Sequence, residues 1–120
     1  IEVDAPQALP AVAVPEAALE TALTTLAVNA RQAGAARLSL SAAQAGDVLI
    51  IAAQDDGPGI PPADRTRLFE PFFTSRRAQG GTGLGLPIAR SLLSASQARI
   101  DFVESDRGAR FDLSLPLAKP

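Results

Sequence analysis

Residues 80–87 read GGTGLGLP, a run in which four glycines fall within six residues and a helix-like segment follows. Gly83 and Gly85 would let the backbone approach an anion closely, and the helix would offer unpaired N–H groups and the positive end of its dipole. A plain flexible turn fits the same letters, because a glycine pattern taken alone is a weak signal. The stretch therefore indicates a phosphate-binding loop without identifying the kind of site.

Two well-known phosphate loops are excluded by the residues around these glycines. The Walker A loop needs a lysine that reaches the phosphates, and the single lysine of the chain is Lys119. The dinucleotide fingerprint G-x-G-x-x-G would place its third glycine at Leu86 or at Ile88, depending on where it starts. The glycine loop of protein kinases fails the same spacing test.

Two polar residues elsewhere could complete a nucleotide site. Asp55 ends a strand and is followed by Gly57 and Gly59, so its carboxylate could accept a hydrogen bond from adenine N6 lying on glycine backbone. An ordinary turn containing Asp and Gly explains the same letters. Asn29 lies on the flank of an apolar helical stripe, where its amide oxygen could ligate Mg²⁺, although an ordinary boundary asparagine is the alternative.

A third segment, LFEPFFTSRR over residues 68–77, holds three of the five phenylalanines of the chain. Clustered aromatic side chains in a loop either anchor that loop to the core or form a contact surface. Arg76 and Arg77 follow and suit phosphate, but a solvated basic pair is equally consistent with the sequence.

Composition narrows the function classes. The chain has 120 residues, a net charge of −2 and 47% hydrophobic residues, which predicts one globular domain and argues against a nucleic-acid or membrane-surface partner. It contains no cysteine and no histidine, so disulfides, thiolate chemistry and phosphohistidine are excluded within it. No signal peptide or membrane span is visible, which makes a cytoplasmic setting the default expectation. The start without methionine reads as a fragment of a longer protein.

Hydropathy patterns predict the elements that would position these residues. They indicate helices on one face of a mixed, mostly antiparallel sheet, a two-layer α/β sandwich. In the second helix, Ile88, Leu92 and Ala95 are predicted to face inward. The predicted elements are strands over 1–4 and 11–14 forming a hairpin or edge pair, a helix beginning at Pro15 and stopped by Gly34, strands over 36–42 and 47–55 with a turn at 45–46, a loop over 57–83, a helix over 85–95, and strands over 98–105 and 109–117.

Taken in order, the four segments are more specific than any one of them. An asparagine on the first long helix, D-x-G-x-G after a strand, a phenylalanine-rich box and G-x-G-x-G opening a helix resemble the N, G1, F and G2 boxes of sensor histidine kinase catalytic domains. Those domains belong to the Bergerat-fold (GHKL, HATPase_c) superfamily that includes Hsp90 chaperones, MutL and gyrase B. The resemblance runs from residue 14 to residue 117 and implies a Bergerat-fold sandwich with an ATP lid at about residues 74–80.

The resemblance implies a role for each matching residue. Asn29 would coordinate Mg²⁺ bridging the ATP phosphates, and Asp55 would accept a hydrogen bond from adenine N6. Arg76 would contact a phosphate group, and Asn29 and Arg76 together would form the catalytic set. The nucleotide-binding set would comprise Asn29, Asp55, Gly57, Gly59, Ile60, Phe72, Phe73, Gly81, Thr82, Gly83, Leu84 and Gly85. Within it, Phe72 and Phe73 would help to place the lid against partner helices, and Gly81, Gly83 and Gly85 would lay amides on the phosphates.

Three positions depart from the family pattern. Thr25 stands four residues before Asn29, where the kinases carry a second asparagine and the chaperone-type ATPases a glutamate. A threonine cannot activate water as a base, and it leaves the kinase site one amide short. Ser96-Gln97 replaces paired glycines after the second helix, which predicts a changed turn, and Ala109 stands where family members often have threonine.

The resemblance implies a catalytic domain that donates the γ-phosphoryl group of Mg·ATP to a histidine on a separate dimerisation domain, with a response-regulator receiver domain downstream. Phosphoryl transfer requires mainly positioning and charge neutralisation, so the nucleophile can come from another domain. Three alternatives stay open: a nucleotide-dependent binding module that transfers nothing, a GHKL-type ATPase, and a Ser/Thr kinase relative. The phosphoacceptor domain is absent from these 120 residues.

Overall fold

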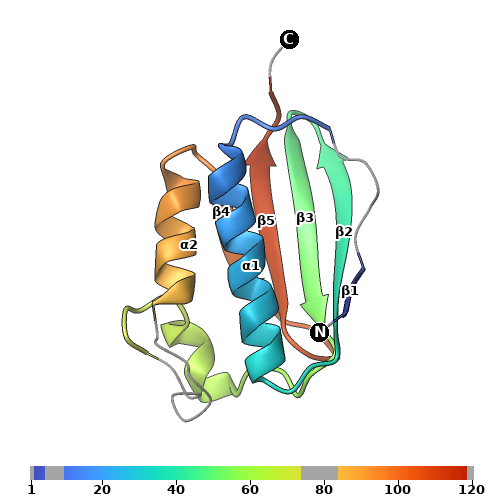
Figure 1. Ribbon diagram of the computed structural model, residues 1–120, viewed down its shortest axis with the longest axis vertical. Helices are drawn as coiled ribbons and strands as arrows, with labels where there is room; N and C mark the ends of the chain where they lie inside the picture. The colour runs from blue at the N-terminus through green and yellow to red at the C-terminus, as the bar shows by residue number, and fades with distance from the viewer. Residues whose placement is uncertain (1, 5–9, 74–83, 119–120) are drawn as a thin grey trace.

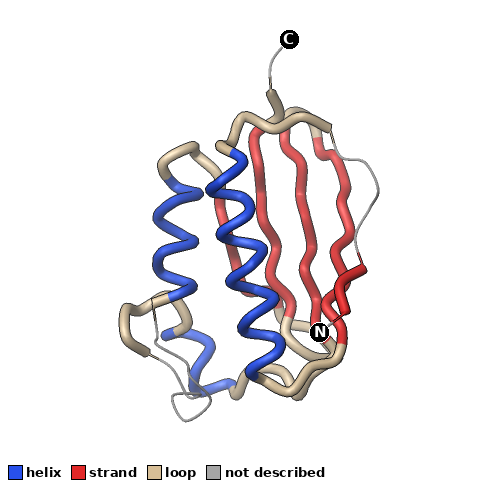
Figure 2. The backbone as a smooth tube through the Cα atoms, viewed as in Figure 1, coloured by secondary structure: helices blue, strands red, loops and turns tan. Residues whose placement is uncertain are grey.

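The computed structural model describes residues 2–4, 10–73 and 84–118 (Figure 1). These residues form two layers, a five-stranded sheet and two α-helices that lie on the same face of the sheet (Figure 2). The predicted two-layer α/β sandwich is therefore confirmed. Among the described helices, none combines the length and the hydropathy needed to cross a membrane.

The sheet is mixed and mostly antiparallel, with the strand order β1-β2-β3-β5-β4. Only β1 and β2 pair in parallel, and the other neighbours pair antiparallel. The strands are β1 (Glu2–Asp4), β2 (Arg37–Ala45), β3 (Val48–Asp55), β4 (Arg99–Val103) and β5 (Arg110–Pro116). In this register the end of β3 lies between the start of β2 and the start of β5, which places Asp55 where three segments meet.

In the described residues, α1 (Glu16–Gln32) and α2 (Gly85–Ser94) cover the sheet, and a short 3₁₀ helix, η1 (Pro62–Arg67), precedes α2 in the chain. Pro15 is the N-cap of α1 and Glu16 stands in its first turn, near the positive end of the helix dipole. The residues of α1 that are buried recur at four-residue intervals and are mostly small: Ala18, Ala22, Leu26 and Ala30. Small side chains allow the helix to lie close to the sheet.

The core lies between the helices and the inner faces of β3 and β5. Alternate residues of both strands are buried there, as the strict burial alternation of each strand shows. The largest fully buried side chains are Ile51, Leu93, Leu113 and Leu115. The predicted hairpin of β2 and β3 and the predicted pair of β4 and β5 are both present, and the alternation within β3 and β5 reflects burial on one face.

The prediction for the N-terminal segment is wrong in one respect. Residues 2–4 do form a strand, but it pairs in parallel with β2 and not with residues 11–14. Val12 makes only an isolated bridge with Leu117, and Val14 is buried in the core. Pro10 and Pro15 bracket this stretch, and because proline supplies no N–H for a strand ladder, they limit how far pairing can extend from the bridge at Val12.

The predicted inward face of the second helix is also wrong. Ile88 is 48% exposed, Leu92 is 39% exposed and Ala95 is exposed. The buried residues of α2 are Leu86, Ala89 and Leu93. Both sets follow helical spacing because the polar side chains of α2 are confined to Arg90, Ser91 and Ser94, so periodicity alone cannot choose between them, and packing against α1 and β4 decides.

Both helices end in the same C-terminal motif. After α1, the N–H of Gly34 donates to the carbonyl of Arg31, and the N–H of Ala35 donates to the carbonyl of Ala30. After α2, the N–H of Gln97 donates to the carbonyl of Ser94, and the N–H of Ala98 donates to the carbonyl of Leu93. This is a Schellman motif, whose C′ residue takes a left-handed backbone, with φ of +88° at Gly34 and +61° at Gln97. Gln97 thus takes in this chain the left-handed position that favours glycine.

Gln97→Gly is expected to stabilise the protein by about 1 kcal/mol, because a left-handed backbone costs an L-residue about 1–2 kcal/mol and the gain is partly offset by the entropy of glycine in the unfolded chain. Gln97 is exposed, so little packing is lost. The free energy of unfolding from urea denaturation measures the effect. Gly34→Gln is the matched control and is expected to destabilise by a similar amount, since a Cβ there would meet no atom within 4 Å. A loss of stability in Gln97→Gly would contradict the assignment.

Candidate nucleotide-binding site

The centre of the candidate site is the Asp55 carboxylate at the end of β3. Asp55 is the one buried charged residue in the described ranges, with 9% exposure. Its Oδ1 accepts hydrogen bonds from the N–H of Gly57 at 2.9 Å and from the N–H of Ala109 at 3.0 Å. Its backbone N–H also donates to the carbonyl of Ala109. Oδ2 has no hydrogen-bond partner in the part of the chain that the structure describes, so it is available to a ligand.

Glycines shape the backbone around this carboxylate. A Cβ on Gly57 would lie 3.3 Å from Asp55 Oδ1, and Gly59 has φ of +84° with only 3.2 Å between its ideal Cβ position and the carbonyl oxygen of Gly108. Ile60 follows and is buried. The guanidinium Nε of Arg65, on η1, donates to the carbonyl of Ile60 and holds the end of the loop. Residues 55–60 are therefore a fixed loop and not a freely variable turn.

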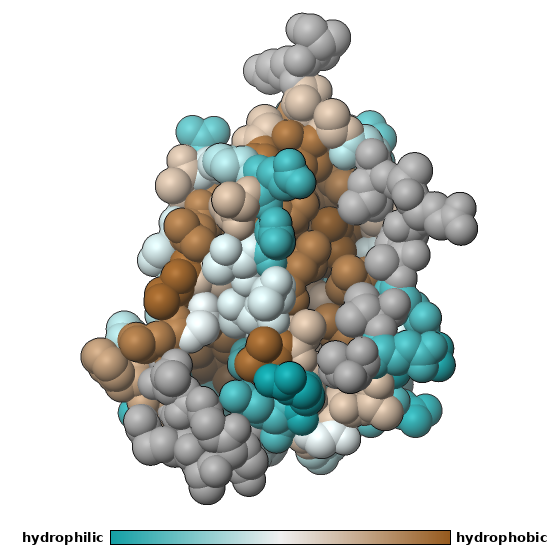
Figure 3. Space-filling model, viewed as in Figure 1, coloured by the Kyte–Doolittle hydropathy of each residue, from teal (hydrophilic) through white to brown (hydrophobic). Residues whose placement is uncertain are grey.

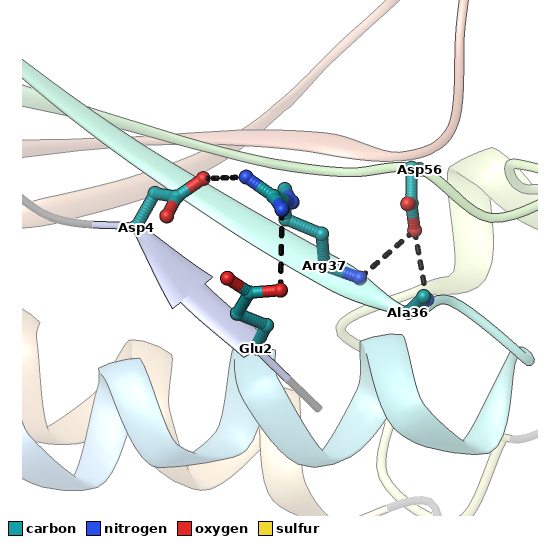
Figure 4. A network of polar contacts seen from close by, with 5 residues as sticks. All are labelled: Glu2, Asp4, Ala36, Arg37 and Asp56. Atoms are coloured by element: carbon teal, nitrogen blue, oxygen red, sulfur yellow. Dashed lines mark hydrogen bonds and ion pairs between the residues drawn. The ribbon is translucent and has the colours of Figure 1, made fainter.

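The next carboxylate, Asp56, ties this loop to the start of β2 (Figure 4). Its Oδ1 accepts from the N–H of Ala36 at 2.8 Å and from the N–H of Arg37 at 3.0 Å. The Arg37 guanidinium in turn donates to Glu2 at 3.1 Å and to Asp4 at 2.5 Å, both on β1. Two successive aspartates thus bond in opposite directions, Asp55 towards β5 and Asp56 towards β2.

The contribution of Asp56 to stability is expected to depend on pH. The hydrogen bond from the N–H of Arg37 is the main cause that lowers the pKa of this carboxyl below its ordinary value. Because the folded pKa is the lower one, the ionised group stabilises the fold above the unfolded pKa of about 3.9, and this contribution is lost as the pH falls through the folded pKa.

Thermal unfolding of wild type and Asp56→Asn as a function of pH measures this contribution. The wild type is expected to be the more stable at pH 7, with the difference shrinking below about pH 4. Asp47→Asn controls for net charge, because the Asp47 carboxylate is exposed and accepts no hydrogen bond in the described ranges. A difference that stays constant down to about pH 2 would contradict the role of the Asp56 charge.

Asn29 and Asp55, the two polar residues that the sequence singles out, line the same pocket. The pocket has a volume of about 30 Å³ and lies between α1, the sheet, the 55–60 loop and the start of α2. Its lining is apolar apart from these two side chains. Sequence reasoning did not identify Leu68 and Leu86 as lining residues, since nothing in their local pattern distinguishes them from core leucines. The full lining is Leu26, Asn29, Leu38, Ala53, Asp55, Ile60, Leu68, Leu86, Ala109 and Phe111.

The side-chain oxygen of Asn29 is available as a ligand for a metal ion. Asn29 is half-buried, and its side-chain amide makes no hydrogen bond with another described residue, so the oxygen is available. Across the described ranges no cluster of three or more His, Cys, Asp or Glu side chains could hold a metal ion by itself. A cation here would therefore be held through one amide together with ligand oxygens and waters, which is how proteins commonly bind Mg²⁺.

The phenylalanine segment is anchored at one point and exposed at another. The ring of Phe69 packs edge-on against Phe111 with 6.4 Å between centroids, and the guanidinium of Arg90 lies 4.8 Å over it. Arg67 lies 4.3 Å over the ring of Phe73. Phe72 is 66% exposed and has φ of +66°, a backbone conformation that a bulky residue rarely adopts. Phe69 thus anchors the segment to the core, and the use of Phe72 as a contact surface stays a prediction.

The remaining predicted site residues divide into two groups. Leu84 is the N-cap of α2 and Gly85 is its first residue, so the described end of the glycine loop does open a helix. Leu86, one residue later, lines the pocket, which places this helix start beside Asn29 and Asp55. Arg76, Gly81, Thr82 and Gly83 lie outside the described residues.

Comparison with protein families gives a match over residues 15–119 to the histidine kinase-, DNA gyrase B-, and HSP90-like ATPase family. The sensor histidine kinase CpxA of Escherichia coli is 35% identical over 107 residues, which covers 85% of this chain and 23% of CpxA. The sensor protein kinase PilS of Pseudomonas aeruginosa is 44% identical over 71 residues, which covers 59% of this chain and 13% of PilS. The chain thus spans less than a quarter of the length of these relatives.

Solved structures agree with this match. Full-length ShkA in complex with AMPPNP superimposes with a TM-score of 0.82 and 28% identity, over 99% of this chain and 26% of ShkA. The ATP-binding domain of PrrB from Mycobacterium tuberculosis gives a TM-score of 0.76 and 26% identity, over 99% of this chain and 82% of that one.

Proposed function

Because the chain belongs to the histidine kinase-, DNA gyrase B-, and HSP90-like ATPase family, we propose that it binds Mg·ATP and donates the γ-phosphoryl group to a histidine on a separate domain. The sensor histidine kinases among its relatives favour this branch of the family. The observation that carries the proposal is the buried Asp55, one of whose oxygens accepts no hydrogen bond from a described residue, in a pocket that Asn29 also lines.

Asp55 would distinguish adenine from other nucleotide bases. Two backbone N–H groups hold Oδ1 and fix the carboxylate plane, which leaves Oδ2 as an acceptor for the exocyclic amine of adenine. A buried acceptor of this kind discriminates strongly, because a base without the matching donor leaves it unpaired. At about 30 Å³ the pocket has room for roughly one water molecule, so the base would enter as side chains at the rim, such as the half-buried Leu68, move outward.

Asn29 and the start of α2 would serve the phosphates. Asn29 would ligate the Mg²⁺ that neutralises charge on the phosphate oxygens, and the N-terminal end of α2 would add its dipole and N–H groups. Arg76, Gly81, Thr82 and Gly83 are proposed to complete this half of the site, in keeping with the family motif they match.

The acceptor histidine must come from elsewhere, since the chain has none. An exposed apolar pair on α2 suits contact with the helices that would carry it. The pair is Ile88 and Leu92; Phe72, in the segment after η1, is the other large hydrophobic side chain that is exposed in the described ranges. Figure 3 shows hydrophobic residues along the outer side of α2. Exposed apolar side chains gathered on one helix mark a surface that a partner covers.

Calorimetry followed by phosphotransfer tests the proposal. The folded chain is expected to bind Mg·ATP and, with labelled ATP, to phosphorylate an added histidine-bearing dimerisation domain of a sensor kinase, but not the same domain with that histidine replaced by alanine. No binding of Mg·ATP by the folded chain would refute the proposal. Binding without transfer to a matched acceptor would favour a nucleotide-dependent binding module, and steady phosphate release by the chain alone would favour a GHKL-type ATPase.

A further inference from the structure

We infer that Thr25 is a positioning residue, whose methyl group packs against Gly85 and sets the separation between α1 and the first turn of α2. A Cβ built on Gly85 would lie 3.0 Å from Thr25 Cγ2 and 3.9 Å from Thr25 Oγ1. The methyl group and not the hydroxyl therefore faces the backbone at this point. The inference rests on the proposed function, because it concerns the half of the site that would hold phosphates.

Gly85 is a glycine for lack of space and not for its backbone conformation. Its φ lies outside the left-handed range, and it is the first residue of α2. Alanine is ordinarily the better residue in a helix, so without a neighbour the change Gly85→Ala would be neutral or stabilising. At 3.0 Å from Thr25 Cγ2, the new methyl group would force the two helices apart by a few tenths of an ångström.

This contact lies directly beside the candidate site. Thr25 is four residues before Asn29 and next to Leu26, and Gly85 is next to Leu86; Leu26, Asn29 and Leu86 all line the pocket. Residues four apart share a helix face, so Thr25 and Asn29 look towards the same side of α1. A shift of the α2 start relative to Asn29 therefore changes the spacing across which a phosphate chain would be held.

The hydroxyl of Thr25 takes no part in the contact between α1 and α2 in the described ranges. It makes no hydrogen bond with another described residue, although Thr25 is half-buried. The family pattern places an asparagine at this position in kinases and a glutamate in chaperone-type ATPases. In this chain the position supplies a methyl spacer instead of a ligand.

A double-mutant cycle with two matched partners tests the inference. Calorimetry of Gly85→Ala is expected to show a Kd for Mg·ATP about 10-fold higher than wild type, with the Kd for adenosine within about 2-fold. Thr25→Ser removes the methyl group and keeps the hydroxyl, so T25S/G85A should return to within about 3-fold of T25S alone. Thr25→Val keeps a methyl group and removes the hydroxyl, so T25V/G85A should stay as weak as G85A.

The inference is overturned if G85A binds Mg·ATP as wild type does, if T25S fails to restore binding, or if T25V restores it equally well. Thermal midpoints of the same variants provide a second readout. The midpoints should fall in G85A, recover in T25S/G85A and stay low in T25V/G85A. Any other order of midpoints overturns the inference. This comparison holds even where G85A folds too poorly for calorimetry. Failure of the wild-type chain to bind Mg·ATP would refute the proposed function alone, since the midpoints still decide the packing of Thr25.

Discussion

Replacing Gly108 by alanine is expected to lower the free energy of unfolding by about 3–5 kcal/mol, which is enough to unfold many domains of this size. Gly108 has φ of +65°, and a Cβ there would overlap the carbonyl oxygen of Asp55. The same Cβ would come within 2.7 Å of both the carbonyl carbon and Oδ1 of Asp55. No rotamer relieves this contact, because the atoms that clash include backbone of the central strand β3.

The clash is severe because Asp55 cannot move away. Its backbone N–H donates to Ala109, and its Oδ1 accepts from Ala109 and from Gly57, so the strand end, the loop and the start of β5 are bonded together. Relief of the overlap would break these hydrogen bonds around a buried carboxylate. Leaving such groups unsatisfied costs more than the bonds contribute.

Gly46→Ala separates the steric part of this effect from the conformational part. Gly46 has φ of +62°, close to that of Gly108, but a Cβ there would meet no atom within 4 Å. Its replacement should therefore cost only the left-handed conformation, about 1–2 kcal/mol. Urea denaturation of both variants measures the difference. Equal losses at the two positions would contradict the close approach of Gly108 to Asp55.

Much of the fold could be predicted because its signals are local. The apolar run of residues 47–55 predicts a buried strand, which is β3, and Gly34 marks the end of α1 through its left-handed backbone. The inward face of α2 could not be predicted in the same way, because Ile88 and Leu86 both belong to stripes with helical spacing. The parallel partner of β1 is a long-range choice, which no short-range pattern encodes.

The candidate site shows the same difference between local signals, which could be predicted, and long-range contacts, which could not. Asp55 and Asn29 could be identified from their motifs, and the structure places both on one pocket. What could not be predicted is how Asp55 is held, since its partner Ala109 lies 54 residues further along the chain. The departure from threonine at Ala109 says nothing of this contact, because the backbone N–H of the residue makes it. Every residue except proline carries a backbone N–H, so a hydrogen bond from the backbone cannot be inferred from the residue type.

Asp55→Asn is expected to raise the Kd for Mg·ATP about 100-fold, or about 2.7 kcal/mol, while the protein stays folded. Asparagine can keep the two hydrogen bonds from Gly57 and Ala109, because its Oδ1 replaces the oxygen that accepts them. Its Nδ2 then takes the place of Oδ2 in the pocket. The acceptor for the adenine amine is thereby lost, and a donor stands opposite a donor.

Inosine triphosphate makes this prediction specific to the base, since it carries an oxygen acceptor where adenine carries the amine. Nδ2 of the variant can donate to that oxygen, so the preference for ATP over ITP should fall by about 10-fold or more between wild type and D55N in competition calorimetry. Asp47→Asn makes the same change of charge in the hairpin turn at the opposite end of β3 and should leave both affinities as they are. If D55N weakened ATP and ITP equally, Asp55 would hold the loop in shape without reading the base.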